Sequence, residues 1–149
     1  MVEKTSKKSF PRHRARRAAL MAMFAHQIGG ENALESLIEM ILSYEELQDS
    51  VIEFFKELLQ ASLLREELAD SIIDEVAENW EINRISAVDR NILRIGIAEF
   101  IDFPKISSNV TIDEAIELAK EFGSAQSSKF VNGILDAAMR KLKKLDITK

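Results

Sequence analysis

The sequence predicts an all-α protein, and three observations support this fold class. Only two prolines and five glycines occur in 149 residues, so few positions interrupt a helix. Apolar residues recur at steps of three and four along most of the chain, which is the period of a helix with one buried face. No stretch shows the strict alternation of apolar and polar residues that half-buried strands have. With 46% apolar residues the chain can bury a sizeable core, and we expect six or seven helices with short connections in an orthogonal bundle.

The first helix is expected from Arg12 to Ile28. Pro11 suits the entry to a helix, because its φ is already helical and its missing N–H is not needed there. Gly29 and Gly30 end the helix. Residues 1–11 are expected to form a flexible basic arm, and residues 12–149 a single all-α domain. The apolar surface of the first helix is formed by Ala18, Leu20, Met21, Met23 and Phe24.

The middle of the chain predicts short helices over roughly 32–42, 45–61 and 65–79. Ser86 followed by Asp89 is a capping pattern that starts the next helix. That helix is apolar on nearly every side, which predicts that it lies at the centre of the core. Gly96 and Gly133 fall inside helical patterns at a cost of about 1 kcal/mol each, which indicates close helix approach. The apolar positions of the central helix are Val88, Ile92, Leu93, Ile95, Ile97 and Phe100.

The C-terminal part of the chain predicts two further helices. Thr111 followed by Glu114 is a capping box that starts the first of them. Gly123 stands where a left-handed residue would end it. A polar loop from Ser124 to Ser128 follows, and the last helix is expected from Lys129, with an apolar stripe at Phe130, Ile134, Ala138 and Leu142.

Composition argues against several classes of protein. The chain has no Cys, so a disulfide framework, a thiolate zinc site and a Cys nucleophile are excluded. No apolar run reaches the roughly 20 residues of a membrane span, and we expect a cytoplasmic protein that does not contact a membrane. The usual phosphate-loop, metalloprotease and hydrolase motifs are missing. Acidic clusters such as Asp74, Glu75 and Glu78 have the pattern of solvated helix faces. We therefore expect neither enzymatic activity nor a cofactor or metal ion.

Charge is strongly polarised along the chain. Residues 1–17 carry seven basic residues against Glu3, a local charge of +6, which leaves −11 for the remainder. Cations in the first turn of a helix oppose its dipole by roughly 0.3–1 kcal/mol each, so helix stability does not account for them. A nucleic-acid phosphate would relieve that repulsion. The alternative is a tail that only solubilises the protein.

Four segments together resemble the NusB family of bacterial transcription antitermination factors. They are RHRARRAALMAMFAHQ (12–27), ENWEINRISAVDRNILRIGIAEF (78–100), VTIDEAIELAKEFG (110–123) and SSKFVNGILD (127–136). The resemblance implies a fold of two perpendicular three-helix bundles. It also implies a factor that binds the boxA sequence of nascent ribosomal RNA transcripts together with NusE, a small-subunit ribosomal protein, and that acts on RNA polymerase elongation within an antitermination complex.

The resemblance also implies an RNA surface. It assigns phosphate contacts to the first helix, and backbone and base contacts to Lys129 and Phe130. On sequence alone, Phe130 is equally well explained as a core residue. Gln126 stands where related proteins often have an acidic residue, and this difference reduces repulsion of RNA. The phosphate-contacting residues are Arg12, Arg14, Arg16 and Arg17.

The NusE-binding face that the resemblance implies includes Phe24 and Asp89. Asp89 is also expected near the N-terminus of a helix, where its negative charge interacts favourably with the helix dipole, and one residue can have both roles. Asn132 is interpreted as a polar core residue that holds the preceding loop. The same apolar and basic surfaces also allow a homodimer.

Two other functions are compatible with parts of the sequence. The first is a helical protein-interaction module whose acidic body docks a basic partner, with only non-specific RNA affinity. The second is a helix-turn-helix DNA-binding protein, but Arg84, Arg90 and Arg94 are too interrupted by acidic and core positions to form a basic recognition face.

Overall fold

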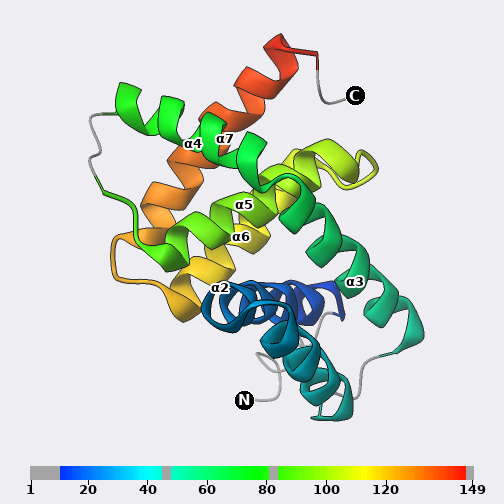
Figure 1. Ribbon diagram of the computed structural model, residues 1–149. Coiled ribbons are helices and arrows are strands. Elements are labelled where there is room, and N and C mark those ends of the chain that lie inside the picture. The colour runs from blue at the N-terminus through cyan, green and yellow to red at the C-terminus, as the bar shows by residue number, and fades with distance from the viewer. Residues whose placement is uncertain (1–10, 45–47, 81–83, 147–149) are drawn as a thin grey trace. The chain divides into compact units, whose positions relative to one another are not determined.

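The computed structural model describes residues 11–44, 48–80 and 84–146, and every regular element in these ranges is a helix (Figure 1). The all-α prediction is confirmed. The chain divides into two compact units, Met1–Gln60 and Ala61–Lys149. The expected basic arm lies outside the described residues except for Pro11. The helices are α2 (Pro11–Tyr44), α3 (Asp49–Leu64), α4 (Glu66–Asn79), α5 (Ala87–Asp102), α6 (Ser108–Phe122) and α7 (Ser127–Lys144).

The first unit contains α2 and most of α3. Within α2, Gly30 has φ 74° and ψ −156°, so the element consists of two helical halves that meet at a kink. Only glycine adopts this left-handed conformation at little cost, and the predicted end of the first helix at Gly29–Gly30 is confirmed. Met21 was expected in the apolar face but is exposed. The buried residues of the unit include Ala15, Ala19, Leu20, Met23, Val51, Phe54, Phe55 and Leu58.

The second unit is organised around α5. Every residue from 91 to 100 is buried, because α5 packs against α4, α6 and α7 together. The predicted central helix is therefore confirmed. A Cβ at Gly96 would lie 3.0 Å from both terminal methyl groups of Leu135, so a larger residue would not allow α5 and α7 to approach as closely. Ser86 begins α5 as predicted, because its Oγ accepts a hydrogen bond from the Asp89 N–H.

Ion pairs join α4 to α5. Arg90 donates hydrogen bonds to Asp70 and Asp74, and Arg94 donates two to Asp70. The basic side chains of α5 are thus engaged by acids of α4 and do not form a free recognition face. No described helix is long and apolar enough to cross a membrane.

Two local predictions in α6 were wrong. Helix α6 begins four residues earlier than expected, with Ser107 in place of Thr111 as its N-cap. Thr111 is buried instead, and its hydroxyl donates to Glu99 Oε1 at 2.8 Å. Gly123 ends the helix with an extended backbone, φ −98° and ψ −167°, and not with a left-handed one. A side chain at Gly123 would meet Ser127 and the Ala119 carbonyl, so glycine serves close packing at this position.

Candidate nucleic-acid interface

The arginines at the start of α2 differ in how accessible they are. Arg12 is exposed, Arg14 and Arg17 are half-buried, and only 3% of the Arg16 surface is accessible. The pattern follows from the helix period, because Arg16 lies on the same helix face as the buried Ala19, Leu20 and Met23. Of the four arginines, Arg12 is therefore the best placed to meet a phosphate.

Phe54 of α3 is the residue of this site that sequence reasoning missed. The guanidinium carbons of Arg12 and Arg16 lie 4.6 and 5.3 Å from the centre of its ring. These are cation–π distances, and they hold both guanidinium groups in one place. The apolar stripe of α3 identified Phe54 only as a core residue, and no local spacing signals its pairing with arginines some 40 positions earlier in the chain.

The start of α7 carries the second group of predicted RNA-binding residues. Lys129 and Gln126 are exposed, whereas Phe130 is half-buried. Phe130 thus packs against the unit and also keeps accessible surface on which a base can stack. These three residues lie within about one helical turn of one another, whereas the arginines belong to the other unit.

Ser127 shapes the turn before α7. Its side chain is almost completely buried, and its Oγ accepts a hydrogen bond from the Ser124 N–H at 2.9 Å. Asn132 is exposed, so its interpretation as a polar core residue was wrong. The hydrogen bond to the backbone at this turn is instead made by the Ser127 hydroxyl.

The predicted partner-binding residues also lie on helices. Phe24 is half-buried in the first half of α2. Asp89 stands in the first turn of α5 with 9% of its surface accessible. Its Oδ1 is shielded from solvent and has no hydrogen-bond partner among the described residues. A carboxylate in this position has unused acceptor capacity.

The described residues hold no group of three His, Asp or Glu side chains arranged to bind a metal ion. The side chains at these surfaces offer positive charge, hydrogen-bond donors and aromatic rings.

The sequence model of the NusB family matches residues 13–140. The chain belongs to the NusB family. The transcription antitermination protein NusB of Koribacter versatilis (strain Ellin345) is 36% identical over 135 residues, which cover 91% of this chain and 92% of that protein. NusB of Desulfitobacterium hafniense (strain DSM 10664 / DCB-2) is 37% identical over 136 residues, which cover 91% of this chain and 92% of that protein.

Solved NusB structures share the fold. NusB of T. maritima superposes with a TM-score of 0.77 at 36% identity, over 91% of this chain and 96% of that one. A complex described as antitermination factors NusB and NusE with double-stranded RNA gives a TM-score of 0.75 at 27% identity, over 88% and 97%. The region matched to the NusB family includes every predicted site residue except Arg12, which immediately precedes it.

Proposed function

We propose that this chain is a cytoplasmic, non-catalytic transcription antitermination factor. It binds boxA RNA of nascent ribosomal RNA transcripts together with NusE and acts on RNA polymerase elongation. Membership of the NusB family is the observation that carries the proposal, and the NusB–NusE–RNA complex with the same fold supports it.

Phosphate contacts come from the arginines of α2. Arg12 presents an exposed guanidinium that is already positioned by the Phe54 ring, so binding a phosphate costs little side-chain entropy. Arg14 and Arg17 add positive charge from the same helix. Affinity from this source falls steeply with salt, because each neutralised phosphate releases counterions.

Base and backbone contacts come from the start of α7. Lys129 contacts a phosphate, Phe130 stacks on an unpaired base, and Gln126 offers an amide to a base edge. Single-stranded RNA is recognised in this way, since its bases can be splayed out and stacked on aromatic side chains. The uncharged Gln126 keeps this surface free of the repulsion that a carboxylate would cause.

NusE binds the face that carries Phe24 and Asp89. A basic side chain of NusE pairs with the Asp89 carboxylate in the first turn of α5. Phe24 supplies apolar contact area.

A titration tests the proposal. Labelled boxA RNA and a scrambled RNA of equal length are titrated with the full chain at two salt concentrations, with and without purified NusE. We expect tighter binding to boxA RNA and a further gain with NusE. Equal binding to both RNAs that collapses with salt would refute the proposal and leave a protein-docking module with a basic terminus.

A further inference from the structure

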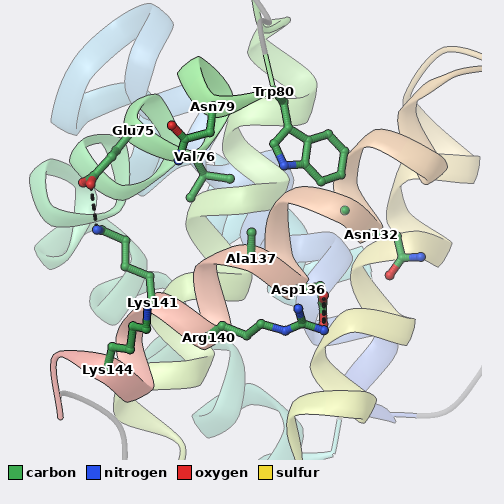
Figure 2. A pocket seen from close by; sticks show the side chains of 11 residues that line it. Glu75, Val76, Asn79, Trp80, Asn132, Asp136, Ala137, Arg140, Lys141 and Lys144 are labelled. Atoms are coloured by element: carbon green, nitrogen blue, oxygen red, sulfur yellow. Dashed lines mark hydrogen bonds and ion pairs between the residues drawn. The ribbon is translucent and has the colours of Figure 1, made fainter.

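A groove between α4 and α7 contains none of the predicted RNA-binding residues of α2 or of the start of α7. Its volume is about 750 Å³. Figure 2 shows Trp80, from the end of α4, beside α7, with Arg140, Lys141 and Lys144 following along the same helix. All of its walls belong to the second unit. The groove is lined by Glu75, Val76, Asn79, Trp80, Asn132, Gly133, Asp136, Ala137, Arg140, Lys141 and Lys144.

Trp80 is an exposed aromatic residue on a firm support. Its ring lies against Gly133, where any side chain would collide with it, yet 49% of the Trp80 surface is accessible. An isolated surface tryptophan would be mobile, but this ring is held by α7 beneath it. A flat ring with an open side at the edge of a groove is suited to stacking.

The cations of the groove are held only weakly by acids. Arg140 Nη2 lies 3.0 Å from Asp136 Oδ2, and the Arg140 side chain is 73% exposed. Lys141 Nζ lies 2.7 Å from Glu75 Oε2, and this pair is more sheltered, because the Lys141 side chain is only 29% exposed. Both partners of the Arg140–Asp136 pair are exposed, and an exposed ion pair stabilises a protein by less than about 1 kcal/mol, so a phosphate can take the place of Asp136 at little cost. Lys144 adds a second exposed cation to Arg140, whereas Lys141 is half-buried.

The groove continues the surface at the start of α7. Lys129, Asn132, Asp136, Arg140 and Lys144 recur at steps of three and four, so they share one face of the helix. The distance along the axis from Lys129 to Lys144 is about 22 Å at 1.5 Å per residue. A strand that contacts Lys129 and Phe130 therefore needs to extend by only a few nucleotides along α7 to reach Trp80.

We propose that this groove binds the single-stranded RNA that flanks boxA, with a base stacked on Trp80 and phosphates at Arg140 and Lys144. The inference rests on the proposed function, because the RNA must first be held at Lys129 and Phe130. An aromatic platform beside cations is the usual construction of a site for single strands, and it tolerates different sequences. The helix dipole accounts for lysines in the last turn of α7, but it does not account for the exposed Trp80.

The matched NusB region ends at residue 140, so Lys141 and Lys144 lie beyond it.

Trp80 also provides the measurement, because it is the only tryptophan in the chain. The full protein is titrated with boxA RNA and with the same RNA extended by six uridines at its 5′ or its 3′ end, and both affinity and tryptophan fluorescence are followed. We expect one of the two extensions to quench Trp80 and to tighten binding by about tenfold, the effect of one stacked base. BoxA RNA without an extension should quench Trp80 much less.

A double variant tests the cations without disturbing the ring. Arg140→Glu with Lys144→Glu should abolish the gain from the extension and leave binding of unextended boxA RNA within about twofold of the unchanged protein. The matched control is Lys105→Glu with Lys120→Glu, which makes the same change of charge at exposed positions outside the groove. The control should keep the gain.

Each other outcome overturns the inference. If boxA RNA binds but neither extension quenches Trp80 or tightens binding, the groove does not bind RNA and the proposed function stands. If the control variant loses the gain as fully as the groove variant, the effect is general electrostatics. If an acidic peptide quenches Trp80 and the extended RNAs do not, the groove is a protein-docking site. If boxA RNA itself does not bind, the proposed function and this inference both fail.

Discussion

Arg94 of α5 and Asp70 of α4 are joined by two parallel hydrogen bonds, from Nε to Oδ1 at 2.8 Å and from Nη2 to Oδ2 at 2.7 Å. Arg94 also donates to the Asn91 side chain, and only 7% of its surface is accessible. The planar guanidinium matches the carboxylate in this geometry, which lysine cannot reproduce. The pair thus fixes the position of α4 on α5.

Asp70→Asn should lower the free energy of unfolding by about 1.5–3 kcal/mol, because it removes a charge-assisted partner from a buried guanidinium. The control is Asp74→Asn, which loses one exposed pair with Arg90 and should cost less than about 1 kcal/mol. Urea denaturation of both variants measures the difference. Equal losses of unfolding free energy in the two variants would show that burial of the Arg94–Asp70 pair adds no stability.

The Asp70 contribution should also depend on pH. Partial burial by itself raises the pKa of Asp70, but the hydrogen bonds and charge of Arg94, and then of Arg90, outweigh it and lower the pKa below the ordinary 3.8. A carboxyl group whose pKa is lower in the folded protein than in the unfolded chain stabilises the folded protein at any pH above its unfolded-state pKa. This stabilisation is lost as the pH falls through the pKa of the folded state. The difference in the free energy of unfolding between the unchanged protein and Asp70→Asn should therefore be largest near pH 7 and should disappear as the pH falls below about 4.

Thr111→Val should destabilise the protein more than Ser107→Ala does. The first change removes a buried donor from Glu99 and should cost about 1–3 kcal/mol. The second removes an exposed helix cap with a 3.3 Å hydrogen bond and should cost about 1 kcal/mol or less. Thermal unfolding of both variants measures which change destabilises the protein more. A larger loss for Ser107→Ala would show that the exposed cap contributes more stability than the buried Thr111–Glu99 hydrogen bond.

Gly133→Ala should displace Trp80. A Cβ at this position would lie 2.6 Å from Cζ3 of the indole, so the ring has to move or the helices have to separate. Overpacking of this kind costs about 1–3 kcal/mol, against a gain of up to about 1 kcal/mol in helix propensity. Tryptophan fluorescence and the unfolding midpoint should both change. Asn132→Ala, at the adjacent exposed position, is the control and should change neither.

Arg12→Ala and Arg16→Ala should have different effects. Arg12→Ala should weaken RNA binding and reduce the salt slope by about one, because it removes one phosphate contact from an exposed side chain. Arg16→Ala should lower stability by about 1–2 kcal/mol, because the Arg16 guanidinium is buried beside Phe54. RNA titration measures the expected loss of affinity in Arg12→Ala, and urea denaturation measures the expected loss of stability in Arg16→Ala. A stable Arg16→Ala protein with weaker RNA binding would make Arg16 a direct contact.

Asp89→Asn should weaken NusE binding by about tenfold or more while the fold is retained, because Asn has the same shape and lacks the charge. Asp113→Asn makes the same change of charge at an exposed position of α6 and should leave NusE affinity unchanged. Calorimetric titration of each variant with NusE provides the measurement. If both variants bind NusE as the unchanged protein does, the partner face lies elsewhere.

The sequence by itself determined the all-α fold, the break at Gly30, the Ser86 cap of α5 and the central place of α5. Each of these follows from interactions within about four residues or from the period of apolar side chains, and both are visible in a linear sequence.

Only the tertiary structure decided which polar and aromatic residues are accessible. Thr111 has the local pattern of a cap, yet it is buried because Glu99 lies across from it on α5. Arg16 and Arg12 are alike in sequence, and the burial of one beside Phe54 distinguishes them. Trp80 remains exposed because Gly133 of a distant helix supports only one side of its ring. Such outcomes depend on residues far apart in the chain, and local propensity and periodicity carry no information about those contacts.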